Sequence, residues 1–295
     1  MKLIKSSFEI IEPTGYTIDD IYKSIELAGR VSHKSEDKIT EDSAKTFVDR
    51  IINLGHNSCL EFGTIYLYIN YHDPKFNKII EKYITNEYSK CIILEKEAFI
   101  TTSYRIIIEN NWLDDLKYLC KPTKYHHKRY TVKFICDRGI LAEFTRHRKF
   151  SFMAESSRYC NYSKGKFNSE LTFIIPCWMD IPEGSIDLGN YDKTSARYED
   201  GSVYIIDTKP PYVGVDFIRS LCEAEAYYLS IVRNGWKPEQ ARAVLPNALK
   251  TELYMCGFAE DWKHFFNLRC SSNAHPDAQK LAVGVRDKFI SLGCI

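Results

Sequence analysis

The sequence lacks three features that define common classes of protein. It has ten cysteines but no Cys-x-x-Cys pair, so the spacing typical of a zinc ribbon is missing. No apolar run approaches the roughly 20 residues of a membrane-spanning helix, and Met1–Glu12 holds no apolar stretch of signal-peptide length. We therefore expect a cytoplasmic protein with reduced thiols, no metal site and no membrane contact.

An excess of charge of either sign is also absent. The 295 residues include 40 Lys and Arg against 39 Asp and Glu, which gives a formal net charge of +1. A chain without a global basic field is a poor candidate for a nucleic-acid-binding protein, so any attraction for anions must be local. Hydrophobic residues make up 44% of the chain and charged residues 27%, as in an ordinary soluble globular protein.

One local concentration of positive charge lies between residues 146 and 159, which read RHRKFSFMAESSRY. It favours Arg over Lys, and the planar guanidinium suits bidentate recognition of phosphate or carboxylate. Phe150, Phe152 and Tyr159 lie between the charges and can stack on a planar ligand. The stretch predicts a pocket for a phosphorylated, planar, anionic molecule. From residue types alone, the alternative is a solvated basic face or a loose nucleic-acid contact.

The order of these residues resembles the RHRxxSxxxxSxR signature of the flavin-dependent thymidylate synthases, the ThyX family. All six fixed positions of that signature are filled here, by Arg146, His147, Arg148, Ser151, Ser156 and Arg158. Six matches at fixed spacing are a specific signal, in contrast to a single glycine motif.

Four shorter phrases resemble other parts of the same family, in the family's order. Residues 30–32 read RVS, as found early in the family. Residues 55–62 read GHNSCLEF and resemble Gly-His-x-Ser/Thr-x-x-Glu-His, with Phe62 where the family usually has His. Residues 241–246 read ARAVLP and resemble Ala-Arg-x-x-Leu-Pro, and residues 267–269 read NLR and resemble the closing motif. The resemblance therefore extends over most of the chain.

Three further positions depart from the family's pattern. Met153 and Ala154 stand where the family commonly has polar residues, and Phe258 stands where some members have Asn near the flavin. Ala154 and Phe258 have no side-chain donor or acceptor, so any hydrogen bond to a ligand there must use backbone groups.

Hydrophobic spacing predicts both helices and strands around these motifs. The expected helices cover residues 17–32, 40–54, 140–145 and 215–234, and the expected strands cover residues 8–11, 64–71, 130–136 and 171–175. Thr17 is the expected N-cap of the first helix, with Asp19 and Asp20 in its first turn.

The fold class follows from these elements and from the resemblance. Helix-like pieces occur at residues 74–85 and 103–119, inside a segment that shorter family members lack. We expect an α+β protein, with a single ThyX-like catalytic domain over residues 1–295 and a helical insertion at about residues 73–128. The resemblance implies a central, mainly antiparallel sheet flanked by helices.

The activity implied by the resemblance is the synthesis of dTMP from dUMP. In this family FAD is reduced by NADPH, and the one-carbon unit of 5,10-methylenetetrahydrofolate becomes the methyl group, with release of tetrahydrofolate. The cofactor carries the hydride chemistry, while the protein supplies position and field. The implied cofactor is therefore FAD, the implied co-substrates are NADPH and methylenetetrahydrofolate, and the implied assembly is a homotetramer with active sites shared between subunits.

The resemblance also implies roles for individual residues. Arg269 is the implied catalytic residue, because a guanidinium close to uracil favours the ionised N3 form of the ring; Ser156 is the second candidate. The implied dUMP-binding residues are Glu143, Arg146, Ser156, Ser157, Arg158, Arg242 and Arg269. The implied FAD-binding residues are Ser32, His56, Ser58, Glu61, Arg146, His147, Arg148 and His264.

Two other functions compete with this interpretation. A cysteine-dependent methylase is suggested by Pro176-Cys177, which superficially resembles the Pro-Cys-His of the cysteine-dependent thymidylate synthases, but residue 178 is Trp. A Cys after a strand is more often a small buried apolar residue. A nucleic-acid-binding protein would use the Arg-rich stretch at residues 146–159, and its binding to oligonucleotides would fall steeply with salt.

Overall fold

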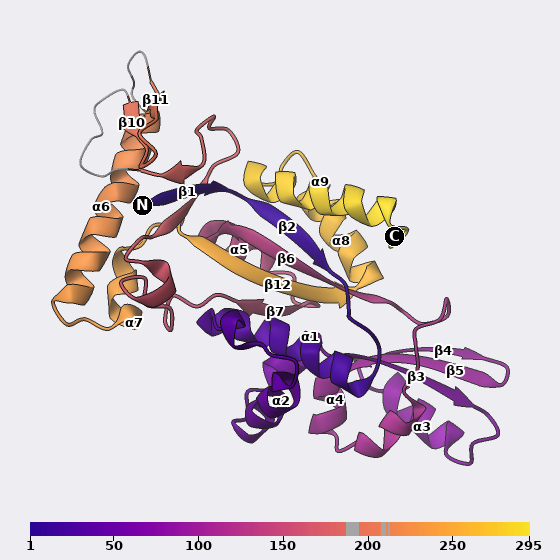
Figure 1. The fold of residues 1–295 in the computed structure, drawn as a ribbon. Helices are drawn as coiled ribbons and strands as arrows, with labels where there is room; N and C mark the ends of the chain where they lie inside the picture. The colour runs from indigo at the N-terminus through magenta and orange to yellow at the C-terminus, as the bar shows by residue number, and fades with distance from the viewer. Residues whose placement is uncertain (187–194, 208–210, 212) are drawn as a thin grey trace.

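A four-stranded antiparallel sheet lies at the centre of the molecule (Figure 1). The computed structural model describes residues 1–186, 195–207, 211 and 213–295. The strand order is β2-β6-β12-β7. The strands are β2 (Ser7–Ile11), β6 (Arg129–Asp137), β12 (Lys250–Phe258) and β7 (Ser151–Ala154). The predicted α+β class with a mainly antiparallel sheet is therefore confirmed.

Helices cover both faces of this sheet, which explains why β12 is buried along nearly its whole length. On one face lie α8 (Ala259–Arg269) and α9 (Pro276–Ser291), and on the other lies α1 (Ile18–Arg30) (Figure 1). Leu253 and Met255 of β12 belong to the core that includes Trp262 of α8. Alternate residues of β12 face α1, as period-two side-chain alternation requires.

The start of α1 agrees with its sequence signal. Thr17 is the N-cap, and the Asp20 N–H donates to the Thr17 Oγ1 while an Asp20 carboxylate oxygen accepts from the Thr17 N–H at 3.0 Å. This capping box satisfies two backbone N–H groups that a helix N-terminus otherwise leaves unpaired. The helix then presents Ile21, Ile25 and Ala28 to the interior.

The segment expected as a helical insertion is not purely helical, and that prediction is wrong. Besides α3 (Phe76–Ile84) and α4 (Tyr104–Glu109) it holds a hairpin of β4 (Lys90–Leu94) and β5 (Glu97–Ser103). β5 pairs with β3 (Thr64–Asn70) to give a second antiparallel sheet, β3-β5-β4, beside α2 (Ser43–Asn53). The hairpin is rich in Ile, Phe and Thr, whose branched or aromatic side chains favour strands.

A third sheet, β8-β1-β9, lies at the other end of the molecule and contains a parallel pair, β1 with β8. Its strands are β1 (Lys2–Lys5), β8 (Thr172–Ile175) and β9 (Gly184–Ser185). The long helix α6 (Val213–Arg233) packs there through Ile218, Leu221 and Tyr228. A short hairpin, β10 (Ser195–Arg197) with β11 (Val203–Ile205), lies close by (Figure 1).

Two further findings concern the chain as a whole. All ten cysteines are free thiols. Across the residues that the structure describes, no helix combines the length and the apolar character needed to cross a membrane.

Candidate functional site

The end of α5 (Arg138–Phe144) and the end of α8 meet, and they bring four predicted site residues together. Asp137 caps α5 by accepting the Ile140 N–H at 2.7 Å, and the buried Phe144 anchors its last turn. The chain then turns, so that His147 lies against Phe265 of α8, with ring centroids 5.0 Å apart. Glu143, His147, His264 and Arg269 therefore come from two elements far apart in the sequence.

Arg269 is fixed by three hydrogen bonds. Its Nε donates to Nε2 of His147 at 2.9 Å, its Nη1 to Oε2 of Glu143 at 2.5 Å, and its Nη2 to the Glu143 carbonyl at 2.7 Å. The guanidinium carries five N–H hydrogens, so one hydrogen on each Nη remains for a ligand. Its side chain is 17% exposed and the Glu143 side chain 32%, so the pair is half-buried and open on one side.

His147 is neutral at physiological pH. Partial burial, together with the positive charge of Arg269 and the nearby His264, lowers the pKa of His147 to about 4. Since Nε2 accepts from Arg269, the ring proton of the neutral imidazole lies on Nδ1. The cluster therefore carries the single positive charge of Arg269, opposed by the Glu143 carboxylate.

A second group of predicted residues surrounds the Ser156 turn. The Ser156 N–H donates to the Ser32 carbonyl at 3.2 Å, and the Arg158 N–H donates to Ser156 Oγ at 3.3 Å. The neighbouring Ser157 is buried. The exposed Arg158 guanidinium is 3.2 Å from a carboxylate oxygen of Glu239.

Arg242 lies close to this group along the chain, because Glu239 belongs to α7 (Pro238–Ala241) and Arg242 follows it directly. The Arg242 side chain is exposed and has no hydrogen bond or ion pair with the described part of the chain. An exposed cation of this kind is available to an anionic ligand.

A buried charge network supports the Ser156 turn, and sequence reasoning missed it. Lys250 Nζ lies 2.8 Å from Glu155 Oε2 and 2.7 Å from Glu252 Oε1, and Lys34 Nζ lies 2.8 Å from the same Glu252 oxygen. Burial opposes ionisation of Glu252, but Lys250 and Lys34 outweigh it and lower the pKa of that carboxyl. The only sequence signal was the alternation of Lys250 and Glu252 on one face of a strand.

A third group of predicted residues lines a cavity of about 560 Å³, which we name the signature cavity. Glu61 and Arg148 are its predicted members, and Ser151 of the RHR signature also lines it. The aromatic rings of Phe150 and Phe258 form part of its wall. The remaining lining residues are Glu87, Tyr88, Lys90, Ser103, Arg105, Ile106, Glu109, Arg129, Lys149 and Asp261.

Two arginines of the signature cavity were not predicted from the sequence. Arg105 forms an ion pair with Glu61, and Arg129 Nη1 donates to the Glu61 carbonyl at 2.9 Å. Arg129 opens β6 and carried no motif, and Arg105 lies in the segment taken as an insertion. Nothing in a single sequence shows that these two elements meet.

The side chains of the three groups are separate within one chain. The Phe150 N–H donates to the His147 carbonyl at 3.0 Å, so the backbone links the Arg269 cluster to the signature cavity. Between described residues, no side-chain hydrogen bond or ion pair joins the Arg269 cluster, the Ser156 turn and the signature cavity. His56 and Ser58 are exposed at the start of the 3₁₀ helix Asn57–Phe62, and Arg146 is exposed in the turn after α5. Within the described ranges, no group of His, Cys, Asp and Glu could hold a metal ion.

The profile of one protein family, described as "Thymidylate synthase complementing protein" (Thy1), matches residues 109–292. The chain belongs to this family. The matched residues include the RHR signature, Arg242 and the closing Arg269, and they make up more than half of the chain. The family resemblance expected from the signature is therefore confirmed. The phrases at residues 30–32 and 55–62 lie outside the match.

Several related proteins are similar over about half of this chain. A flavin-dependent thymidylate synthase from Synechocystis sp. is 23% identical over 160 residues, which cover 54% of this chain and 65% of that protein. A probable flavin-dependent thymidylate synthase from Paramecium bursaria Chlorella virus 1 is 25% identical over 166 residues, with the same coverage. A flavin-dependent thymidylate synthase from Kosmotoga olearia is 28% identical over 153 residues, covering 52% of this chain and 58% of that protein. The matches thus span less than two thirds of these relatives.

One solved structure covers nearly the whole of this chain. A UMP/dUMP methylase, PolB from Streptomyces cacaoi, bound with 5-Br dUMP, superposes with a TM-score of 0.44 and 19% sequence identity. The superposition covers 99% of this chain and 93% of that one.

Proposed function

We propose that this protein is a flavin-dependent thymidylate synthase, which makes dTMP from dUMP with 5,10-methylenetetrahydrofolate as carbon donor and NADPH as reductant of FAD. The observation that carries the proposal is the contact between Arg269 and His147, 122 residues apart, within a chain of the Thy1 family. It joins the RHR signature to the closing Leu-Arg motif through a neutral imidazole and an arginine with two free N–H hydrogens.

The dUMP phosphate carries nearly two negative charges and needs fixed cations. We assign it to Arg158 and Arg242, with the Ser156 hydroxyl, the backbone around Ser157 and the exposed Arg146 completing the site. Arg158 has a single exposed carboxylate partner, Glu239, and an exposed ion pair costs little to exchange for a phosphate. The buried network of Lys250, Glu155 and Glu252 holds the backbone of this turn in place.

Arg269 is assigned to the uracil ring. A guanidinium close to the ring favours the ionised N3 form, since an opposite charge lowers a pKa, and the extra electron density makes C5 a better nucleophile. Glu143 and His147 hold the guanidinium plane, and the neutral His147 adds no charge of its own to that of Arg269. The chain thus supplies position and charge for methylation without a protein nucleophile.

FAD supplies the hydride when bound, and the residues of the signature cavity suit its parts. Arg148 and Lys149 are exposed cations without a carboxylate partner in the described ranges, which suits a diphosphate. Phe150 and Phe258 are apolar surfaces for a planar ring. We further assign Ser32, His56, Ser58, Glu61, His147 and His264 to contacts with FAD.

Three broader features belong to the same proposal. A homotetramer with shared active sites would bring together the groups that are separate within one chain. We also propose that residues 1–295 form one catalytic domain and that the protein works in the cytoplasm, where dUMP and NADPH are available.

The visible spectrum of the purified protein tests the proposal. We expect an oxidised flavin band that bleaches on addition of NADPH, and faster with dUMP present. Protein refolded with FAD and still colourless after desalting would contradict the proposal. Steeply salt-dependent binding of an oligonucleotide by a colourless protein would favour the nucleic-acid-binding alternative.

A further inference from the structure

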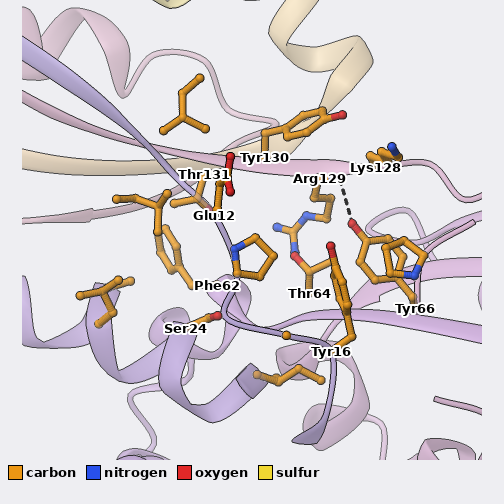
Figure 2. Close-up of a pocket in the computed structure, with 18 of the residues that line it drawn as sticks. Glu12, Tyr16, Ser24, Phe62, Thr64, Tyr66, Lys128, Arg129, Tyr130 and Thr131 are labelled. Atoms are coloured by element: carbon orange, nitrogen blue, oxygen red, sulfur yellow. Dashed lines mark hydrogen bonds between the residues drawn. The ribbon is translucent and has the colours of Figure 1, made fainter. Parts of the chain in front are cut away.

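A second cavity lies between α1 and the central sheet, and it shares Arg129 with the signature cavity (Figure 2). Its volume is about 330 Å³, which is within the usual range of small-molecule sites. We name it the tyrosine cavity because Tyr16, Tyr66, Tyr130 and Tyr254 all line it. They come from the segment before α1, from β3, from β6 and from β12.

The walls of the tyrosine cavity suit a flat apolar body. Ile11, Ile21, Leu27 and Phe62 line it together with the tyrosine rings. Tyr16 and Tyr66 meet edge to face, with ring centroids 5.9 Å apart. Aromatic rings in such an arrangement leave faces and edges for a further ring to pack against.

Arg129 gives this apolar cavity a positive charge. No carboxylate in the described part of the chain forms an ion pair with Arg129, whose side chain is half-buried. Its guanidinium donates instead to three neutral oxygens: Nη1 to the Glu61 carbonyl at 2.9 Å and to Thr64 Oγ1 at 3.4 Å, and Nη2 to Ser151 Oγ at 3.3 Å. Nε and the second Nη2 hydrogen keep one edge of the planar fork for an anion.

Two tyrosine hydroxyls add further donors. Tyr66 Oη accepts the Arg129 backbone N–H at 3.4 Å, the contact drawn in Figure 2, and keeps its own hydrogen for a ligand. Burial raises the pKa of Tyr66 to about 12, so that hydrogen is present at neutral pH. The Tyr254 hydroxyl makes no hydrogen bond to the described residues, and burial raises the pKa of Tyr254 as well.

The charged residues at the edge of the cavity do not remove its preference for anions. Lys128 and Glu12 both lie on the lining, and both are exposed to solvent. Glu12 is the acidic side chain of the lining, and it forms no ion pair with Arg129. Donors thus outnumber charged acceptors around a largely apolar space.

We propose that the tyrosine cavity is a binding site for a planar aromatic carboxylate, with its anionic group on the free edge of Arg129 and its ring among Tyr16, Tyr66 and Tyr254. This site goes beyond the proposed synthase activity. Arg129 also lines the signature cavity, so an occupant of the tyrosine cavity fixes one wall of the other cavity.

Titration of the full-length protein with 2-naphthoate tests this site, with 2-naphthalenemethanol as an uncharged analogue of similar shape. We expect one naphthoate per chain, bound at least about tenfold more tightly than the alcohol, since the alcohol lacks the charge-assisted hydrogen bond to Arg129. Equal affinity for the two compounds, or no saturable binding of naphthoate, would overturn the proposal.

Three variants locate the binding. Ser24 of α1 lines the cavity, so Ser24→Trp should fill it and abolish binding, whereas Lys23→Trp, exposed and outside the lining, should bind as the wild type does. Arg129→Met should lose the preference for naphthoate and keep the weak binding of the alcohol. Unchanged naphthoate binding by folded Ser24→Trp protein would contradict the proposal. This result decides even if the Arg129→Met protein does not fold. Flavin content, measured on the same samples, reports on the synthase proposal separately.

Discussion

The Nε–H of Arg269 is directed at Nε2 of His147 across 2.9 Å, and this contact ties the last residue of α8 to the turn that follows α5. It requires His147 to be neutral, because an imidazolium has no lone pair with which to accept a hydrogen bond. The two residues therefore form one unit, in which the protonation state of one fixes the orientation of the other.

Replacing Arg269 should affect chemistry more than binding. We expect Arg269→Ala to slow single-turnover dTMP formation at saturating dUMP by at least ~100-fold, about 2.7 kcal/mol. In the proposed reaction its charge stabilises the negative charge that develops in the uracil ring. Arg269→Lys should be nearly as slow, since it keeps the charge and loses the fork that spans Glu143 and His147. Flavin content and NADPH-driven flavin reduction without dUMP should persist.

The control for this experiment is Arg286→Ala, since Arg286 is a half-buried arginine on α9 that bonds to its neighbour Asp287. A melting temperature measured beside the kinetics separates two roles. A stable Arg269→Ala protein with normal methyl transfer would contradict the catalytic assignment. An unstable, flavin-free protein would show that the pair with Glu143 mainly holds the fold.

His147 should make stability depend on pH in the acid range. The pKa of the folded His147, about 4, lies below the ordinary histidine value of 6.5, so its contribution to stability is complete above pH 6.5. It is lost as the pH falls from 6.5 toward 4, because the unfolded imidazole then binds a proton that the folded one does not. We expect the loss of unfolding free energy on acidification to be about 2 kcal/mol smaller in His147→Gln than in the wild type. Urea denaturation at pH 7.5, 6 and 5 measures the unfolding free energy of both proteins. The same decline of this free energy with falling pH in both proteins would contradict the assignment.

Arg158 should discriminate the nucleotide from the nucleoside. Loss of a charge-assisted hydrogen bond to phosphate should weaken dUMP binding by roughly 1.5–3 kcal/mol in Arg158→Ala and leave deoxyuridine binding nearly unchanged. Calorimetric titration with both ligands measures the difference. Equal losses for the two ligands would show that Arg158 does not hold the phosphate. Glu239→Gln frees Arg158 from its exposed partner and should bind dUMP at least as well as the wild type.

No cysteine should be required for catalysis. Burial raises the pKa of the Cys160 thiol to about 12, and burial and Asp277 raise the pKa of the Cys177 thiol. A protonated thiol is a poor nucleophile. We expect Cys160→Ala and Cys177→Ala to keep turnover within about tenfold, ~1.4 kcal/mol. Complete loss of turnover in either folded, flavin-loaded variant would revive the cysteine-dependent alternative.

Elements with a strong local signal were predictable from the sequence. The cap at Thr17 and the spacing of Ile21 and Ile25 predicted α1 with bounds within one or two residues of those observed. The β-branched residues predicted β3 and β6. β12 was not predicted as a strand, although it is the strand that both β6 and β7 pair with. It is buried on both faces, so it lacks the polar and apolar alternation that marks a half-buried strand.

For the candidate site too, individual residues were predictable from the sequence and their contacts were not. Motif spacing identified His147 and Arg269, but their contact depends on how α8 packs against α5, which no local pattern encodes. Arg129 belongs to no motif. It gains its role only because the 3₁₀ helix Asn57–Phe62, β3 and β7 bring Glu61, Thr64 and Ser151 around it. Long-range pairing of this kind is set by tertiary packing and not by local propensity.

Product analysis tests the proposed synthase most directly. Purified, flavin-loaded protein is mixed with dUMP, methylenetetrahydrofolate and NADPH, and the nucleotide and folate products are separated and quantified. In the proposed reaction the reducing hydride comes from NADPH through the flavin, so we predict dTMP and tetrahydrofolate in equal amounts, and no dTMP when NADPH is omitted. Formation of dihydrofolate, which marks the folate itself as the reductant, or absence of dTMP from the complete mixture, would contradict a flavin-dependent thymidylate synthase.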